Sequence, residues 1–355
     1  MPTMTLRIPA LAALATTLLL SACTGGSASG ESSVTEPPLE TDVAKLEAGL
    51  SCTEFTHPDK PAVLLVHGTF TAGFEQYDWT YKPLLVARGY DVCTVTYPDR
   101  GLGDAQISAE YVVHALRQMR ARSGRKVAMI GHSQGVAVPR WAIKWWPSAR
   151  DAVDDFVMQA GPNHGGDPVG LFTLLRPILP GASSAAPVLP EALYQMVGNS
   201  AFIQATNAGD ETPGDISYSA MYTLFDELVQ PVNPVPTAAV DWQQDNPKVA
   251  NILLQDVCPG RIVDHVTIGL IDRLAFELAL DAIGHPGPAN VERVLEAAGG
   301  QSALCGLLPI LPSLEIAPLP QLLLGLLGIL PQDAAAGLPQ LHLSTGEPEL
   351  KPYAR

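Results

Sequence analysis

The sequence is poor in basic residues. Of its 355 residues only 21 are Lys or Arg, against 36 Asp or Glu, so the formal net charge is −15 at pH 7. Proteins that bind nucleic acid neutralise its phosphates with clustered Lys and Arg, and no basic run stands out in this chain. The composition therefore argues against a nucleic-acid partner.

Metal-ligand clusters and long clean apolar runs are also missing. The His and Cys residues do not group at the spacings typical of metal ligands, so we predict no metal and no organic cofactor. Residues 304–338 form a tract rich in Leu, Ile and Pro. Prolines and Glu315 interrupt this tract before it reaches the about 20 apolar residues that a membrane-spanning helix needs. No transmembrane span is therefore expected there.

Cysteine is scarce too, and the first of the five has a separate assignment. Residues 1–22 are interpreted as a lipoprotein signal peptide, because the single basic Arg7 precedes an apolar stretch too short to span a membrane. The stretch ends in the letters LSAC, with Cys23 last, which resembles the bacterial lipobox, whose cysteine is acylated. The alternative is an ordinary secretory signal peptide with Cys23 as a spare thiol. Two or more acyl chains anchor a protein stably, so we expect an extracytoplasmic, membrane-anchored lipoprotein.

The other cysteines form an even set: Cys52, Cys93, Cys258 and Cys305. An exported protein meets oxidising conditions, so two disulfides are expected. Spacing alone does not choose among the three possible pairings.

The mature chain divides into a tether and one domain. Residues 23–42 are rich in Gly, Ser, Thr, Glu and Pro and show no apolar periodicity, which is typical of a flexible tether. Residues 43–355 contain no second linker of this kind. We therefore predict a single folded domain over residues 43–355, and we expect it to be monomeric.

Apolar runs and helical periodicities alternate along this domain. Bounded apolar runs predict strands, and apolar spacing along one face predicts helices. The predicted strands are 62–66, 90–96, 126–130, 155–160 and 217–223, and the predicted helices are 77–88, 107–122, 135–146 and 271–283. Such alternation predicts an α/β fold with a mostly parallel central sheet and helices on both of its faces.

The most informative motif lies between the strand at 126–130 and the helix that follows it. Gly131-His132-Ser133-Gln134-Gly135 matches the pattern G-x-S-x-G, which marks the nucleophile elbow of the α/β-hydrolase fold. Its glycines leave room for a tight turn that lifts the serine hydroxyl out of the sheet. The strand–turn–helix context, more than the string itself, predicts Ser133 as a nucleophile.

A serine hydroxyl needs a base that takes its proton. In this fold the acid and then the histidine follow the serine along the chain. His265, which follows the apolar pair Ile262-Val263 and precedes a helix, is the predicted base. His285, in the Gly/Pro turn after that helix, is the alternative.

A carboxylate must orient the base, and active sites in parallel sheets gather at the carboxyl ends of the strands. Asp226 lies in the turn that follows the predicted strand 217–223, so it is the predicted acid. Glu227 and Asp264 are the alternatives.

Acyl transfer also needs N–H donors for the oxyanion that forms on the substrate carbonyl. The residue after the nucleophile supplies one donor, which is the backbone N–H of Gln134. The loop after the strand 62–66 supplies the other, and Thr69 is the candidate, through its backbone N–H and its hydroxyl.

These residues together carry a resemblance to a known family. The chain from about residue 46 onward resembles the Candida antarctica lipase B-like family of α/β-hydrolases. The matching stretches occur in one order over nearly the whole mature chain, which is more specific than any single motif. They are Leu64-Leu65-Val66-His67-Gly68-Thr69, Ser133-Gln134-Gly135, Asp226-Glu227-Leu228-Val229-Gln230-Pro231, Val263-Asp264-His265 and Pro352-Tyr353-Ala354-Arg355.

The resemblance implies the same catalytic set, with Ser133, Asp226 and His265 as the triad and Thr69 with Gln134 as the oxyanion hole. It also implies disulfides between Cys52 and Cys93 and between Cys258 and Cys305. One departure concerns the residue before the nucleophile, which is His132 here and Trp in the yeast enzyme, where it bounds the alcohol pocket.

The expected activity is hydrolysis of carboxylic esters through an acyl-enzyme, with acylglycerols as the leading substrates. An esterase for short soluble esters and a non-catalytic lipid-binding lipoprotein are the alternatives, and a protease or thioesterase would share the same triad. The substrate cleft is expected between apolar residues of segments 171–205 and 304–330. The tract 304–338 is then either core packing or a wall of the acyl pocket.

Overall fold

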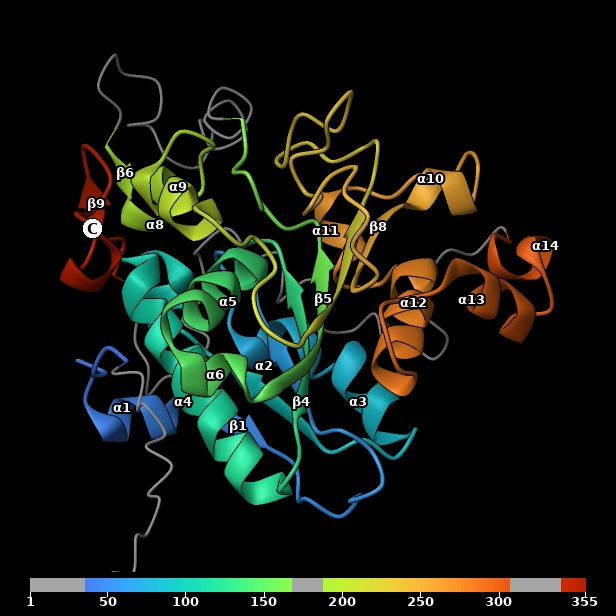
Figure 1. Ribbon diagram of the computed structural model, residues 1–355, viewed down its shortest axis with the longest axis horizontal. Coiled ribbons are helices and arrows are strands. Elements are labelled where there is room, and N and C mark those ends of the chain that lie inside the picture. Colours follow the sequence, from blue (N-terminus) through green and yellow to red (C-terminus); the bar gives the residue numbers. More distant parts are fainter. Residues whose placement is uncertain (1–35, 168–187, 307–339) are drawn as a thin grey trace, which may run out of the picture. The chain divides into compact units, whose positions relative to one another are not determined.

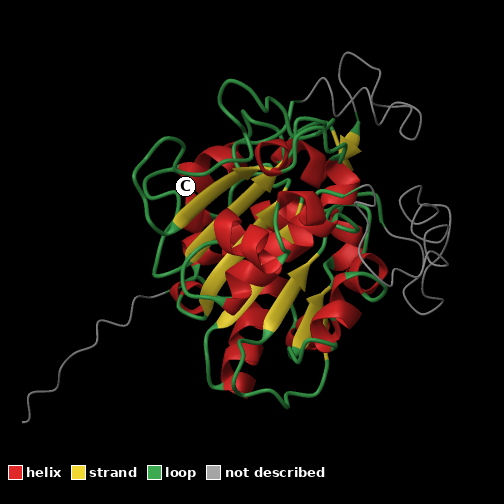
Figure 2. Ribbon diagram, turned by 90° about the vertical axis from the view of Figure 1, so that its right-hand side faces the viewer, coloured by secondary structure: helices red, strands yellow, loops and turns green. Residues whose placement is uncertain are grey.

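One seven-stranded sheet organises the computed structural model, which describes residues 36–167, 188–306 and 340–355. The strand order is β1-β3-β2-β4-β5-β7-β8, and Figure 2 shows strands of the sheet side by side. β1 runs antiparallel to β3, and every other neighbouring pair is parallel. The strands are β1 (Leu50–Cys52), β2 (Val63–Val66), β3 (Val92–Val95), β4 (Val127–His132), β5 (Val153–Gln159), β7 (Ser217–Tyr222) and β8 (Val249–Leu253).

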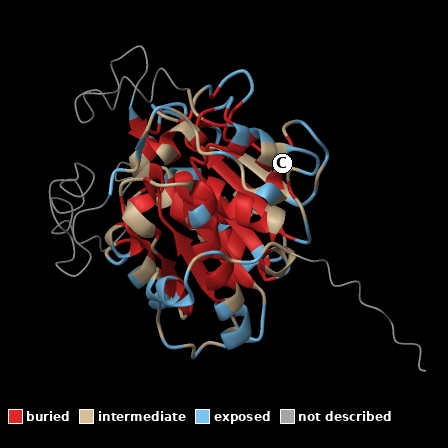
Figure 3. Ribbon diagram, turned by 90° about the vertical axis from the view of Figure 1, so that its left-hand side faces the viewer, coloured by how far each residue is buried: buried red, intermediate tan, exposed pale blue. Residues whose placement is uncertain are grey.

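The central strands are buried on both faces, and this explains their uninterrupted apolar sequences. Successive side chains of a strand point to opposite faces. Accordingly Leu64 and Val66 of β2 join one apolar core, whereas Val63 and Leu65 join the other. Figure 3 shows the buried residues concentrated around the sheet.

Helices cover both faces (Figure 1). The first core is shared with α4 (Ala105–Ser123), α5 (Gln134–Trp145), α6 (Pro147–Arg150) and α9 (Ala201–Asn207). The second is shared with α3 (Tyr81–Val86), α12 (Arg273–Gly284), α13 (Val291–Ala297) and α14 (Gln301–Leu304). The shorter elements are α1 (Val43–Ala48), α2 (Gly73–Tyr77), η1 (Pro98–Gly101), β6 (Leu189–Pro190), α8 (Glu191–Gln195), α10 (Leu254–Val257), α11 (His265–Ile268), β9 (Leu343–Ser344) and η3 (Pro352–Ala354). The predicted α/β class and the mostly parallel sheet are confirmed.

The helix predicted over residues 77–88 is shorter, because α2 already ends at Tyr77 and α3 covers only Tyr81–Val86. Thr80, the N-cap of α3, has non-helical backbone angles, and its hydroxyl donates to the carbonyl of Gln76. Proline is best tolerated in the first turn of a helix, where its missing N–H has no partner to lose. A new helix that starts at Tyr81 places Pro83 in that turn.

The folded unit begins before Val43, the start predicted for the domain. It spans Glu36–Arg355, so the last part of the predicted tether 23–42 belongs to it. The carboxylate of Glu36 pairs with Arg117, and the indole N–H of Trp146 donates to the carbonyl of Pro37 at 2.8 Å. The signal peptide 1–22, Cys23, most of segment 171–190 and nearly all of tract 304–338 lie outside the described residues.

Two disulfides pair as the resemblance implied. Cys52 and Cys93 face each other across the antiparallel pair β1 and β3. Cys258, directly after α10, is bonded to Cys305, directly after α14. In the described part of the chain no helix is both long and apolar enough to cross a bilayer.

Candidate active site

Ser133 occupies a sharp turn between a strand and a helix. β4 ends at His132, α5 begins at Gln134, and Ser133 between them has φ 56° and ψ −126°. A non-glycine residue in such a region costs of order 1–3 kcal/mol and is held there by its surroundings. The turn aims the Ser133 hydroxyl away from the sheet, where a second side chain can reach it.

The two glycines of the motif are required by packing. A Cβ on Gly131 would lie 2.0 Å from the carbonyl oxygen of Gly135, and a Cβ on Gly135 would lie 2.2 Å from that of Val66. The strand and the helix therefore approach too closely at this turn for any side chain at either position.

Three side chains from distant segments meet at the carboxyl edge of the sheet. Oγ of Ser133 lies 2.9 Å from Nε2 of His265, and Nδ1 of His265 lies 3.1 and 3.0 Å from the two carboxylate oxygens of Asp226. Because a carboxylate only accepts, Nδ1 carries the proton, and the lone pair of Nε2 faces the serine hydroxyl. The arrangement can remove a proton from Ser133.

The loops that carry the acid and the histidine are joined to each other. Asp226 follows β7, His265 begins α11, and a parallel bridge links Phe225 to Asp264 directly beside them. The hydroxyl of Thr223 adds a hydrogen bond to the carbonyl of Val263 at 2.7 Å. These contacts set the separation of Asp226 and His265 through the backbone.

The alternative acids have other partners. Oε2 of Glu227 accepts the backbone N–H of His265 at 3.1 Å, and Asp264 caps the N-terminus of α11 by accepting the N–H of Thr267 at 2.7 Å. The alternative base, His285, is half-exposed at the end of α12 and pairs with Asp281. The structure brings none of the three into contact with Ser133 or with the ring of His265.

Charge and burial shift the pKa values of the buried residues Asp226 and His265 in opposite directions. Burial by itself would raise the pKa of Asp226, but the adjacent His265 and the N–H groups of Val229 and Leu228 hold that pKa below its ordinary value. Burial would likewise lower the pKa of His265, but the Asp226 carboxylate raises that pKa above its usual range. The electrostatic environment thus favours an ionised Asp226 and a more basic imidazole.

Two backbone N–H groups, those of Thr69 and Gln134, have no hydrogen-bond partner among the described residues. Thr69 follows β2, and Gln134 is the first residue of α5. The Thr69 hydroxyl donates to Oε1 of Gln134 at 2.6 Å, and Nε2 of Gln134 donates to the carbonyl of Gly101 at 3.0 Å. The side-chain bonds fix both residues and leave the backbone donors available for an oxyanion.

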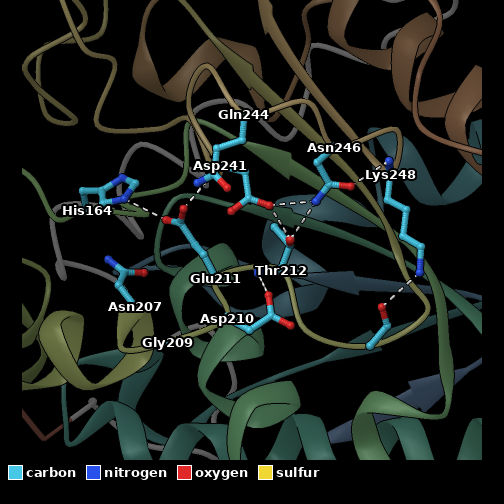
Figure 4. A pocket seen from close by; sticks show the side chains of 11 residues that line it. His164, Asn207, Gly209, Asp210, Glu211, Thr212, Asp241, Gln244, Asn246 and Lys248 are labelled. Atoms are coloured by element: carbon cyan, nitrogen blue, oxygen red, sulfur yellow. Dashed lines mark hydrogen bonds and ion pairs between the residues drawn. The ribbon is translucent and has the colours of Figure 1, made fainter.

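A polar cavity lies away from the Ser133 site. A cavity of about 540 Å³ is lined by polar residues that bind one another, and no residue of the Ser133 site lines it (Figure 4). His164 contacts Glu211 at 2.7 Å, and Asp241 accepts from Thr212 at 2.6 Å. Among the described residues no group of His, Cys, Asp and Glu is arranged to hold a metal ion.

The sequence does not predict the role of two buried residues beside the Ser133 site, Gln76 and His132. In the sequence His132 stands out only as a departure from the family pattern, and nothing there marks Gln76. They lie 56 residues apart, and Nε2 of Gln76 is 3.2 Å from Nδ1 of His132. No spacing in the sequence signals this contact.

A mostly parallel sheet, a serine at a strand–turn–helix elbow and a later acid and histidine define the α/β-hydrolase class. The chain belongs to the class 2 lipase family, since the model of that family, described as Lipase (class 2), matches residues 59–249.

Two relatives illustrate the similarity. Lipase B of Pseudozyma antarctica is 32% identical over 236 residues, which cover 65% of this chain and 64% of that protein. The match thus spans less than two thirds of that relative's length. The crystal structure of Aspergillus fumigatus lipase B superposes with a TM-score of 0.74 at 28% identity, over 90% of this chain and 74% of the other.

Proposed function

We propose that this protein is a serine carboxylic-ester hydrolase, a lipase that acts on acylglycerols. The observation that carries the proposal is the chain of hydrogen bonds from Asp226 through His265 to Ser133, with Ser133 in a strained elbow. Membership of the class 2 lipase family supports it. The reaction is a two-step acyl transfer.

In the first step Oγ of Ser133 attacks the ester carbonyl carbon while Nε2 of His265 takes the hydroxyl proton. The negative charge on the former carbonyl oxygen is stabilised by the backbone N–H groups of Thr69 and Gln134. Asp226 stabilises the imidazolium. His265 then gives its proton to the leaving alkoxide oxygen, the ester C–O bond breaks, and an acyl-enzyme and an alcohol result.

In the second step water takes the place of the alcohol. His265 removes a proton from the water, whose oxygen attacks the acyl carbon, and the same two N–H donors stabilise the second oxyanion. His265 returns the proton to Oγ of Ser133 as the acyl–oxygen bond breaks. A carboxylic acid leaves and the free enzyme is restored.

Exposed apolar side chains beside the site favour a water-insoluble substrate. Phe225 is 47% exposed directly before Asp226, and Ile262 is 77% exposed just before the loop of His265. Apolar surface exposed at a functional site is typical of a membrane, protein or ligand contact. These side chains support the proposal of acylglycerols ahead of short soluble esters.

A fluorophosphonate probe and a chain-length series test the proposal. The probe should label Ser133 in the wild-type protein and not in Ser133→Ala. Rates with p-nitrophenyl esters of increasing chain length should remain high beyond the solubility limit of the ester. A steep preference for short soluble esters would assign the protein as an esterase, and an unreactive folded protein would make it a lipid-binding protein.

The anchor is a separate part of the proposal. The LSAC sequence ending at Cys23 supports acylation of this cysteine, and the two disulfides favour an oxidising, extracytoplasmic compartment. Detergent phase partitioning should place the wild-type protein in the detergent phase and Cys23→Ala in the aqueous phase. Equal partitioning would indicate ordinary secretion, and size-exclusion chromatography tests the expected monomer.

A further inference from the structure

His132, the residue before Ser133, is a buried polar side chain that the proposed reaction does not use. It is the last residue of β4 and is 6% exposed. Its Nε2 lies 2.7 Å from the backbone carbonyl oxygen of His265, and its Nδ1 lies 3.2 Å from Nε2 of Gln76. Because a carbonyl oxygen only accepts, Nε2 carries the proton, and Nδ1 accepts from Gln76.

Gln76 extends this chain of hydrogen bonds to the loop that carries Thr69. Its amide nitrogen donates to His132, and its Oε1 accepts the backbone N–H of Gly68 at 2.9 Å and the hydroxyl of Thr71 at 3.0 Å. Gly68 immediately precedes Thr69. His132 is therefore bonded on one side to the backbone of His265 and, through Gln76, on the other side to the loop of Thr69.

A glycine closes one side of the slot that holds the His132 ring. A Cβ on Gly269, directly after α11, would lie 2.2 Å from Cγ and from Cδ2 of His132. The ring is therefore packed tightly against the backbone of Gly269, and it cannot move toward α11 without moving the segment of His265. On the other side, a Cβ on Gly68 would be in ordinary contact with the ring, 3.4 Å from its Nδ1.

The ring also stays neutral. Burial, together with the nearby His265, lowers the pKa of His132 to about 3. A neutral ring keeps one donor for the carbonyl of His265 and one acceptor for Gln76. A protonated ring would present a second N–H to the amide nitrogen of Gln76 and a positive charge to the imidazolium of His265.

We propose that His132 is a positioning residue, which holds the backbone of His265 and the loop of Thr69 at a fixed distance from each other around Ser133. The base and one oxyanion donor come from segments about two hundred residues apart in the chain, and His132 with Gln76 is a polar link between them. Displacements of about 1 Å at a catalytic group can reduce turnover about 100-fold. This inference rests on the proposed ester hydrolysis.

Two substitutions separate the two hydrogen bonds. The amide nitrogen of a glutamine reaches about as far along the side chain as Nε2 of histidine, whereas the amide of an asparagine reaches only about as far as Nδ1. His132→Gln therefore retains the bond to the carbonyl of His265, and His132→Asn retains only an acceptor for Gln76. His132→Phe fills the slot without either bond. His114→Gln is the matched control, because His114 is buried in α4 and its Nε2 has no hydrogen-bond partner among the described residues.

The measured quantities are kcat and KM for p-nitrophenyl butyrate, with melting temperatures to verify folding. His132→Phe, which removes both bonds, should lower kcat about 10- to 100-fold with KM nearly unchanged. His132→Gln and His132→Asn, which each keep one bond, should each lower kcat by less than His132→Phe. His114→Gln should keep the wild-type kcat. Unchanged kcat in folded His132→Phe, or a kcat in the Gln and Asn variants as low as in His132→Phe, would overturn the positioning role.

A second measurement does not depend on activity. In protein labelled with ¹⁵N-histidine, the His132 ring should show the Nε2–H tautomer and no titration between pH 5 and pH 8, because its pKa is about 3. A ring that titrates in this interval, or that carries its proton on Nδ1, would overturn the inference. If instead the wild-type protein hydrolysed no ester while this tautomer was present, the proposed function would fail, although the hydrogen-bonded link of His132 would be confirmed.

Discussion

The side chain of Glu227 binds the backbone of His265: Oε2 of Glu227 accepts the N–H of His265 at 3.1 Å. The neighbouring carboxylate, Asp226, binds the ring of the same histidine through Nδ1. Two adjacent acids thus hold different parts of one residue. Their removal should have very different effects.

Asp226→Asn should reduce kcat about 10⁴-fold, because an amide that donates to Nδ1 favours the tautomer in which Nε2 can no longer accept the serine proton. Glu227→Gln retains an oxygen that can accept the N–H of His265, so its loss should stay below about tenfold. Steady-state kinetics on both variants measures the contrast. Substantial activity in Asp226→Asn, with a large loss in Glu227→Gln or Asp264→Asn, would reassign the acid.

The pH dependence should follow the raised pKa of His265. The base works only when neutral, so kcat/KM should fall as the pH decreases through this pKa, and the midpoint should lie above the value of about 6.5 for an ordinary imidazole. His132 adds no second acid limb, since its pKa is about 3. Profiles measured from pH 5 to pH 9 test this. A midpoint below the ordinary imidazole value would show that burial, rather than the Asp226 carboxylate, controls the pKa of His265.

Gly135→Ala should destabilise the fold by about 3 kcal/mol or more, because the new methyl group would meet the carbonyl of Val66 in β2 at 2.2 Å. Gly346→Ala is the control, since a Cβ there would have no neighbour within 4 Å. Urea unfolding of both variants measures the difference. Equal stabilities would mean that strand β2 and helix α5 are farther apart than described.

Each disulfide should stabilise the fold by about 4 kcal/mol, because the two close chain segments of similar length, with sequence separations of 41 and 47. The paired substitutions Cys52→Ala with Cys93→Ala, and Cys258→Ala with Cys305→Ala, remove one bridge each. Urea unfolding without reductant should show comparable losses. A loss confined to one pair would indicate that the other bridge does not form in solution.

Several elements were predictable because their physical causes are local. The strands of the central sheet are buried on both faces, so β2 and β4 contain continuous apolar runs, and such runs predict strands. The elbow was predictable because a turn this tight needs glycine at 131 and 135. The edge strands β1 and β8 were missed, since both are only partly buried and lack an apolar run.

The sequence alone determined the class of fold, because apolar runs and helical periods depend on which residues avoid water. It also named Ser133, Asp226 and His265 as candidates, through a motif and an order along the chain, and their catalytic roles stay predictions. Only the tertiary structure decided that Glu227 holds the backbone rather than the ring of His265, and that His132 links that backbone to Gln76. Such contacts join residues tens to more than a hundred positions apart, and the packing of whole elements, rather than any local pattern, brings them within hydrogen-bonding distance.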